Sequence, residues 1–258
     1  ICMVGTGYVG LVSGTCFADI GHQVYCVDKD LSKINQLNSG ISPIYEPGLD
    51  ELIKKNHKAK RLYFTSDLKK AISISDIIFI CVGTPNIKGS LKVDLSFVFK
   101  CTKEILAITK KKKIIVTKST VPIGTGDQIE NIIKKKKKLF SVISNPEFLR
   151  EGEAIRDFRY PDRIIIGSNS KNEFKTMKKL YSPLINKGAK FFTTSRRGAE
   201  LIKYAANAFL ATKITFINEI ANLCEKSGIN IEDIALGIGS DTRIGSRFLR
   251  PGPAYGGS

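Results

Sequence analysis

Three glycines near the start of the chain have the spacing of a dinucleotide-binding turn. Gly5, Gly7 and Gly10 form Gly-x-Gly-x-x-Gly directly after the apolar run Ile1–Val4. In such a turn the first glycine permits the tight bend, the second lets the backbone approach a pyrophosphate, and the third lets the helix pack close to the strand. A helix beginning at Tyr8 would direct its N–H groups at the phosphates. This context predicts a dinucleotide site.

A carboxylate follows the second strand-like run at the distance that such a site requires. Asp28 comes directly after Gln23–Val27, roughly 20 residues beyond the glycine turn. A carboxylate there would accept hydrogen bonds from ribose hydroxyls and repel a 2′-phosphate. We therefore expect NAD in preference to NADP, although the charges of Lys29 and Lys33 oppose that preference.

Polar clusters follow three later strand-like runs, at residues 83–85 (Gly-Thr-Pro), 119–122 (Ser-Thr-Val-Pro) and 145–147 (Asn-Pro-Glu). Ligands of open α/β sheets bind at the carboxyl ends of the strands, so we expect these clusters at one edge with the glycine turn. Glu147 and Glu151 would face one site if their segment is helical, and a helix cap with surface charges explains the same spacing equally well.

Two polar side chains interrupt a long apolar run later in the chain. Lys203 and Asn207 are four residues apart and share a helix face, with Glu200 on the same side. A buried lysine beside an asparagine could hold a developing oxyanion. A lysine that extends its charge to solvent, next to a satisfied asparagine, is the alternative.

Strand-like and helix-like runs alternate through most of the chain. Short β-branched runs predict strands at 1–4, 23–27, 61–65, 77–82, 114–118, 141–144 and 163–166. Helices are expected at 8–20, 31–37, 49–54, 67–74, 95–107 and 126–135. This order predicts an α/β fold with a doubly wound, parallel Rossmann-type sheet, forming an NAD-binding domain over residues 1–195.

A single long helix is expected over residues 199–227, which contain neither proline nor glycine. It would be about 40 Å long and apolar over most of its circumference, as in helices buried between bodies. We expect it to open an all-α central domain, residues 196–258, and to form the core of a homodimer. Three arginines then punctuate a glycine-rich stretch, Arg243, Arg247 and Arg250, and would form either a basic loop near an anionic substrate or a surface loop.

Charge and cysteine usage limit the class of protein. The net charge of +17 suits anionic small molecules and raises nucleic acid as a partner. Much of the excess lies in two lysine runs, 110–113 and 134–138, which are typical of solvated helix ends and carry no interleaved aromatics. We expect no nucleic-acid partner, no membrane segment and no metal. Six cysteines without a Cys-x-x-Cys pair favour a reducing cytoplasm.

Taken together, these segments resemble the UDP-glucose/GDP-mannose dehydrogenase family of nucleotide-sugar 6-dehydrogenases, most closely its members that oxidise UDP-glucose. The matching segments follow the family's order: 5–10 with Gly14, 43–49, 82–85, 118–125, 145–152, 200–207, 218–219 and 248–258. The resemblance implies oxidation of the sugar's C6 alcohol to a carboxylate, giving UDP-glucuronate for polysaccharide biosynthesis, in two steps through a cysteine thioester with two NAD reduced. GDP-mannose and UDP-N-acetylmannosamine are alternative substrates.

The resemblance also implies site residues. NAD contacts are expected at Gly5, Gly7, Tyr8, Val9, Gly10, Asp28, Lys33, Thr84, Thr120 and Glu151. Substrate contacts are expected at Glu147, Phe148, Leu149, Arg150, Glu151, Lys203, Asn207, Arg243, Phe248, Leu249, Arg250, Pro251, Gly252 and Gly256. Among these, Lys203 and Asn207 would stabilise oxyanions. Thr120 would position a water or the substrate oxygen, and Glu147 and Glu151 would be acid–base partners in thioester hydrolysis.

The chain departs from the family pattern at its end. The family's nucleophile is a cysteine directly after Gly-Gly-Ser, and here the sequence stops at Ser258, without the family's C-terminal domain. We therefore expect the chain alone to be inactive and to expose apolar surface near the long helix. A non-catalytic NAD-binding remnant and a basic Rossmann protein that binds nucleic acid are the rival hypotheses.

Overall fold

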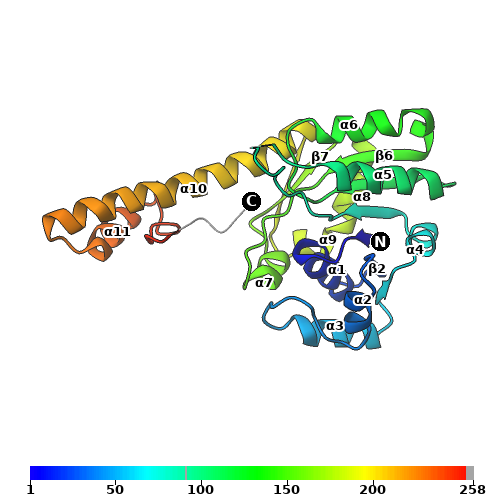
Figure 1. The fold of residues 1–258 in the computed structure, drawn as a ribbon, viewed down its shortest axis with the longest axis horizontal. Helices are drawn as coiled ribbons and strands as arrows, with labels where there is room; N and C mark the ends of the chain where they lie inside the picture. Colours follow the sequence, from blue (N-terminus) through cyan, green and yellow to red (C-terminus); the bar gives the residue numbers. More distant parts are fainter. Residues whose placement is uncertain (91, 254–258) are drawn as a thin grey trace. The chain divides into compact units, whose positions relative to one another are not determined.

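The computed structural model describes residues 1–90 and 92–253 (Figure 1). Its internal contacts divide the chain into two units, Ile1–Leu201 and Ile202–Ser258. The first unit carries the predicted glycine turn and the three polar clusters, and the second carries most of the long helix.

The first unit is built on a mixed, mostly parallel sheet. Among the described residues its strand order is β3-β2-β1-β4-β5-β6-β7-β8. The strands are β1 (Cys2–Val4), β2 (Val24–Val27), β3 (Leu62–Thr65), β4 (Ile77–Ile80), β5 (Lys113–Thr117), β6 (Phe140–Ser144), β7 (Arg163–Gly167) and β8 (Lys190–Thr194). All seven predicted strands are present. The prediction missed β8, because this edge strand is largely exposed and lacks the buried β-branched pattern.

Helices cover both faces of the sheet, as Figure 1 shows. One hydrophobic cluster packs α1 (Tyr8–Asp19), α2 (Leu31–Asn38), α3 (Leu49–Lys58), α7 (Ala154–Arg159), α8 (Lys171–Leu180) and α9 (Ser182–Ile185) on one face. A second cluster packs α4 (Leu68–Ile74), α5 (Ser96–Ile108) and α6 (Thr125–Ile132) on the other. The predicted doubly wound Rossmann-type fold is therefore confirmed.

The sheet is not parallel throughout, which corrects the sequence-based prediction. β6 and β7 are antiparallel at the pair Ser144↔Gly167, and β8 is again parallel to β7. The connection from β6 to β7 contains only the short helix α7, which contacts α1. Because this connection does not cross back over the sheet, β7 starts at the edge where β6 ends and must run in the opposite direction.

The two lysine runs lie at the amino edge of the sheet. Lys113 opens β5 and is paired with Phe140 at the start of β6, so both runs precede neighbouring strands. Lys110 to Lys112 are exposed, as expected, but Lys113 is buried and donates to the carbonyls of Ser73 (3.4 Å) and Ser75. The second run forms a 3₁₀ helix, Lys134–Leu139. This edge is opposite to the carboxyl ends of the parallel strands.

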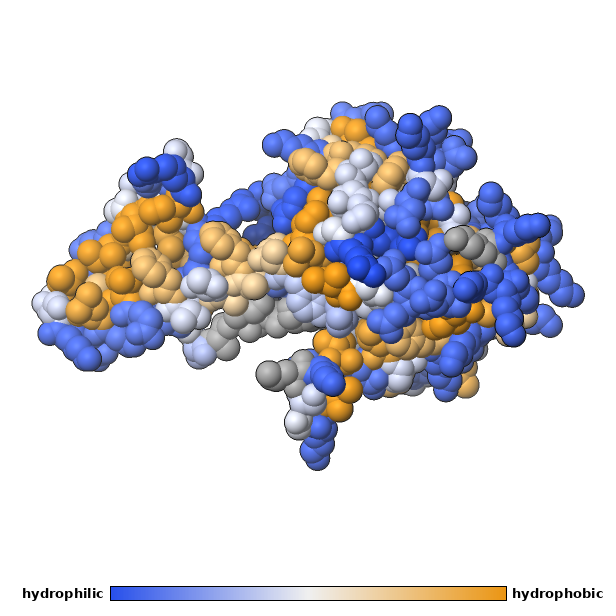
Figure 2. All heavy atoms as spheres, turned by 90° about the horizontal axis from the view of Figure 1, so that it is seen from above, coloured by the Kyte–Doolittle hydropathy of each residue, from blue (hydrophilic) through white to orange (hydrophobic). Residues whose placement is uncertain are grey.

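The second unit is helical and exposes much apolar surface. The long helix α10 (Arg196–Ser227) starts in the first unit, continues through the second and is followed by α11 (Ile231–Gly239). Large side chains remain exposed, among them Phe209 (65%) and Leu236 (75%), and α11 buries no residue. Figure 2 shows this apolar surface. The expected exposure near the long helix is confirmed. No helix among the described residues is long and apolar enough to cross a membrane.

One carboxylate ties the helix of the glycine turn to its neighbours. Asp19, at the end of α1, contacts Lys55 Nζ of α3 (2.7 Å) and Arg159 of α7 (2.7 Å), and accepts from Asn56 Nδ2 (3.4 Å). Burial alone would raise the pKa of Asp19, but the hydrogen bonds from Lys55, Arg159 and Asn56 outweigh burial and lower the pKa to about 2. α1 is therefore fixed at the end opposite to the glycine turn.

Replacing Asp19 by Asn should destabilise the first unit by about 1 to 2 kcal/mol at pH 7, allowing for partial solvent screening of the ion pairs. A carboxylate whose folded-state pKa is depressed contributes stability above its unfolded pKa and loses it as pH falls through the folded pKa. The difference between the proteins should therefore shrink between about pH 4 and pH 2. Urea unfolding across this range measures it, with the exposed Asp76→Asn as control. A pH-independent difference would contradict the assignment.

Candidate functional site

The glycine turn has the geometry that its spacing predicts. Gly5 has a φ of +101°, which L side chains rarely adopt. A Cβ at Gly10 would lie 2.0 Å from the Gly5 carbonyl oxygen, so only glycine lets α1 approach the turn this closely. Gly14, one turn later, would meet Cys26 Sγ at 2.6 Å. A Cβ at Gly7 would instead meet open space, and α1 begins there without a side-chain cap.

Asp28 lies beside this turn. Its Oδ2 accepts hydrogen bonds from the Thr6 N–H (2.9 Å) and the Thr6 hydroxyl (2.7 Å), and its Oδ1 accepts from the Asp30 N–H (3.1 Å). Burial alone would raise the pKa of Asp28, but these bonds and the charge of Lys33 lower it below its usual value. Lys29 forms an ion pair with Glu104 (3.0 Å), so its charge opposes a preference for NAD less than the sequence suggested.

The loops after β4 and β5 are joined to each other. The Thr84 hydroxyl donates to the Thr120 carbonyl (2.9 Å), and the Ser119 hydroxyl donates to the Val82 carbonyl (2.7 Å). Two residues that the resemblance assigns to NAD, Thr84 and Thr120, therefore stand next to each other at the carboxyl edge of the sheet.

The segment after β6 is not helical, which corrects the conditional expectation for Glu147 and Glu151. Residues 145–150 form an irregular loop and 151–153 a turn, in which Gly152 has a φ of +85°. Pro146, which lacks an N–H, and Gly152 bracket the segment and disfavour a helix. The Leu149 N–H donates to Glu147 Oε2 at 2.6 Å, so the carboxylate shapes its own loop.

Charged side chains contact the loop after β6 at Phe148 and Arg150. Arg150, expected at the substrate, is engaged within the chain by Asp157 (2.6 Å) and Glu153 (2.5 Å). The Arg163 guanidinium lies 4.1 Å from the centre of the Phe148 ring. Glu151 is exposed, and its side chain is therefore accessible to a ligand.

A buried polar cluster lies at the root of the same loop and was not predicted. The Tyr181 hydroxyl donates to Asn145 Oδ1 (2.6 Å), Lys118 Nζ lies 3.5 Å from each of these oxygens, and Asn145 Nδ2 donates to the Ile165 carbonyl (3.0 Å). Burial raises the pKa of Tyr181 far above its usual value. The cluster joins the ends of β5 and β6, from which the Thr120 and Glu147 loops start.

Two buried carboxylates, Glu46 and Glu200, accept hydrogen bonds from loops at the carboxyl edge of the sheet. Glu46 accepts from the Tyr8 hydroxyl, from the Gly152 N–H (2.9 Å) and from the Ile155 N–H (3.3 Å). Glu200, in the first turns of α10, accepts from the Gly124 and Gly126 N–H groups (2.6 and 2.8 Å) at the start of α6 and from Ser144 Oγ (3.2 Å). Burial raises the pKa of Glu200 despite these bonds. Glu46 lies in the segment 43–49, whose sequence alone gave no indication of this role.

The remaining predicted substrate residues lie in the second unit. Lys203 and Asn207 share a face of α10 by their spacing. Arg243 is paired with Asp241 (2.6 Å). Phe248 has a φ of +65°, Leu249 is buried, and the other described members of this segment are Arg250, Pro251 and Gly252. Gly256 lies outside the described residues.

Asn218 holds that segment and was not predicted as a functional residue. Its Nδ2 donates to the Gly252 carbonyl (3.0 Å) and its Oδ1 accepts from the Gly252 N–H (2.9 Å). Lys213 Nζ, also on α10, donates to the Ile244 carbonyl (3.0 Å). α10 therefore orders the loop that contains Phe248 and Arg250.

None of the six cysteines has the character of a nucleophile. All are buried. Burial raises the pKa of Cys2, Cys16, Cys81 and Cys101 to about 12, and that of Cys26 further. Such thiols are inert at neutral pH and act as small core side chains.

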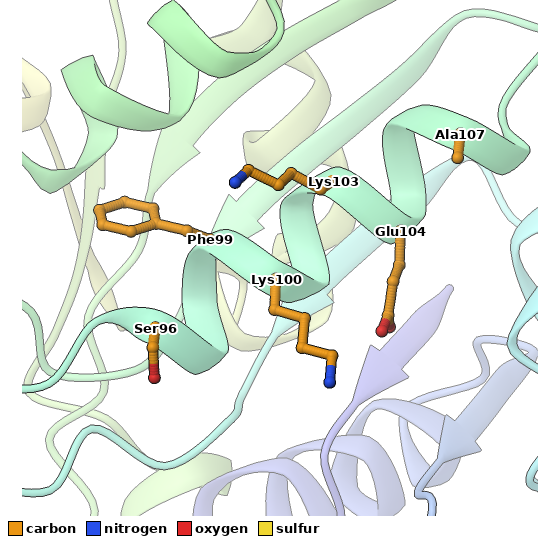
Figure 3. A pocket seen from close by; sticks show the side chains of 6 residues that line it. All are labelled: Ser96, Phe99, Lys100, Lys103, Glu104 and Ala107. Atoms are coloured by element: carbon orange, nitrogen blue, oxygen red, sulfur yellow. The ribbon is translucent and has the colours of Figure 1, made fainter.

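A separate hollow of about 550 Å³ lies along the outer face of α5 (Figure 3). It is lined by Ser96, Phe99, Lys100, Lys103, Glu104 and Ala107. All six come from one helix, and none is among the residues expected at NAD or substrate.

Comparison with known proteins agrees with this geometry. Residues 1–185 match the model of the UDP-glucose/GDP-mannose dehydrogenase family, NAD binding domain, and residues 197–258 match the family's central domain. The chain belongs to this family. Residues 1–185 are thus its NAD-binding domain.

Relatives and solved structures cover the whole chain. It is 56% identical to the UDP-glucose 6-dehydrogenase of Rhizobium meliloti and 50% identical to that of Rickettsia felis, over 100% of this chain and 60% and 57% of those proteins. A UDP-glucose dehydrogenase structure from Pyrobaculum islandicum is 36% identical with a TM-score of 0.93, covering 100% of this chain and 60% of that one. A GDP-mannose dehydrogenase structure from Pseudomonas aeruginosa is 34% identical with a TM-score of 0.88, over 100% and 61%. The chain therefore spans about 60% of the length of such relatives.

Replacing Asn218 by Ala should release the segment around Gly252. Two hydrogen bonds worth about 1 to 2 kcal/mol in total are lost, so local opening should become about five- to thirty-fold more frequent. Trypsin cleavage after Arg247, under native conditions, measures the opening. Asn222→Ala, on an exposed position of the same helix, is the matched control. Equal cleavage rates in the two variants would contradict the role of Asn218.

Proposed function

We propose that the protein containing this chain is an NAD-dependent UDP-glucose 6-dehydrogenase that oxidises the C6 alcohol of UDP-glucose to a carboxylate. The observation that carries the proposal is the convergence of the glycine turn, Asp28, the Thr84–Thr120 pair and the Glu147–Gly152 loop at the carboxyl edge of one sheet. Ligands of doubly wound folds bind at that edge. The names of the relatives at 50–56% identity favour UDP-glucose over GDP-mannose.

The residues at this edge fit a dinucleotide. The open space above Gly7 and the uncapped start of α1 suit a pyrophosphate, and only a small residue at position 7 leaves that space open. A carboxylate has about four acceptor sites. Three donors from Thr6 and Asp30 contact Asp28, which leaves capacity for a ribose hydroxyl. Thr84, Thr120 and Glu151 would line the rest of the cofactor site.

The chain's own residues would bind the sugar and transfer protons during its oxidation. Bound NAD would accept a hydride from the sugar carbon. Oxidation of an alcohol to a carboxylate removes four electrons, so two NAD are reduced for each sugar. Lys203 and Asn207 would stabilise the oxyanions, and Thr120 would position a water or the substrate oxygen. Glu147 and Glu151 would exchange protons with that water.

If the oxidation proceeds through a cysteine thioester, the thiol that forms it would have to be one other than these six. A thioester forms only from a reactive thiolate, and all six cysteines are buried, five of them with a strongly raised pKa. We therefore propose that the chain by itself binds NAD without completing turnover. Cytoplasmic location and a homodimer formed through the long helix α10 belong to the same proposal.

Replacing Gly7 by Ala should weaken NAD binding by about tenfold or more. The backbone there has a φ of −69° and alanine is sterically allowed, so the free energy of unfolding should stay within about 1 kcal/mol of wild type. Calorimetric titration of the chain with NAD measures binding. Gly237→Ala, where a Cβ also meets open space, is the control and should bind NAD like wild type. Wild-type affinity in Gly7→Ala would refute the site.

The substrate is tested on the whole protein by the formation of NADH with UDP-glucose, GDP-mannose and UDP-N-acetylmannosamine. We expect the highest kcat/KM with UDP-glucose and two NADH for each sugar consumed. A higher kcat/KM with either other sugar would overturn the substrate assignment. NAD binding without NADH formation from any of the three would favour the non-catalytic remnant.

A further inference from the structure

We propose that Tyr8 and Glu46 are positioning residues that couple the glycine turn to the loop containing Glu147 and Glu151, so that a dinucleotide bound at the turn orders this loop. The inference rests on the proposed function for the ligand of the turn. It adds a role for a carboxylate that is not expected to touch either cofactor or substrate.

The three partners form a closed set of hydrogen bonds. The Tyr8 hydroxyl donates to Glu46. The Gly152 N–H is shared between Glu46 Oε2 (2.9 Å) and the Tyr8 hydroxyl oxygen (3.0 Å). The Ile155 N–H, at the start of α7, donates to Glu46 Oε1 (3.3 Å). Tyr8 thus contacts both the carboxylate and the loop at once.

Burial makes these bonds necessary. Glu46 is 6% exposed, and a buried carboxylate is costly unless hydrogen bonds replace its water. Of the three donors given above, two belong to the backbone of the 145–155 segment. If that segment moved away, the carboxylate would keep only the Tyr8 hydroxyl. Glu46 therefore favours one position of the loop.

Tyr8 is placed to transmit the presence of a ligand. It follows Gly7 directly and occupies the first turn of α1, whose N–H groups would face an anion bound at the helix start. A ligand that holds this turn in place also holds the Tyr8 backbone, and with it the position of the Tyr8 side chain. Burial raises the pKa of Tyr8 and the bond to Glu46 raises it further, so the hydroxyl stays protonated and remains a donor at neutral pH.

The loop itself has little regular structure to hold it. Residues 145–150 are in neither helix nor strand, and Gly152 is in the left-handed region. Glu151, next to Gly152, is exposed. The position of the loop therefore depends on contacts such as the hydrogen bond from the Gly152 N–H to Glu46.

The test is hydrogen–deuterium exchange of this chain with and without saturating NAD. In wild type, NAD should slow exchange both at the turn (residues 5–11) and in the loop (residues 148–153). In Tyr8→Phe, measured at an NAD concentration that saturates this variant, the turn should still be protected. Protection of the loop by NAD should fall at least threefold.

Tyr63→Phe is the matched control. The Tyr63 hydroxyl donates to the Lys60 carbonyl (2.8 Å) and its ring stacks on Tyr25, away from the turn and loop. It should show wild-type protection at both segments. Glu46→Gln, which keeps the size of the side chain but loses an acceptor, should expose the loop even without NAD. Tyr8→Phe remains decisive if the Gln variant does not fold.

The outcomes separate the two proposals. Wild-type chain without NAD protection at the turn would overturn the proposed function and the coupling with it. Protection at the turn and undiminished protection of the loop in Tyr8→Phe would overturn the coupling alone. In the whole protein at saturating NAD, Tyr8→Phe should lower kcat about tenfold, whereas a purely local role in NAD binding would raise KM for NAD and leave kcat unchanged.

Discussion

The site depends on how closely α1 approaches the end of β1. A Cβ at Gly10 would overlap the Gly5 carbonyl oxygen, and one at Gly14 would overlap Cys26 of β2. This packing sets the position of the helix start and brings the Thr6 N–H and hydroxyl to Asp28. Asp19 fixes the other end of the same helix through Lys55 and Arg159. The packing of α1 therefore places the turn beside Asp28.

Carboxylates, more than regular structure, organise the loops around it. Asp28, Glu46, Glu147 and Glu200 each accept at least one backbone N–H from a loop or a helix start. A buried or half-buried carboxylate favours the backbone position that supplies its donors. The carboxyl edge of the sheet therefore holds defined loops even where, as at 145–150, neither helix nor strand continues.

The framework was predictable because its elements are short and locally determined. Glycine spacing predicted the turn, and apolar β-branched runs predicted β1 to β7. The antiparallel direction of β7 was not predictable, because it depends on α7 packing against α1 and on no local pattern. β8 was missed because its side chains are largely exposed. Glu46, Tyr181 and Asn218 were missed as anchors because their partners are backbone groups or residues more than 30 positions away. For Glu147 and Glu151, spacing alone left open whether their segment is helical, and Pro146 and Gly152 disfavour a helix there.

The central claim is that Asp28 and the glycine turn form a site for NAD. The most direct measurement is the ratio of the dissociation constants of this chain for NAD and NADP, determined by calorimetry under the same conditions. The Asp28 carboxylate, held ionised by Thr6 and Asp30, should repel a 2′-phosphate, and the ion pair of Lys29 with Glu104 leaves less positive charge to attract it. The account predicts that NAD binds about tenfold or more tightly than NADP. Equal affinities, or tighter binding of NADP, would contradict it.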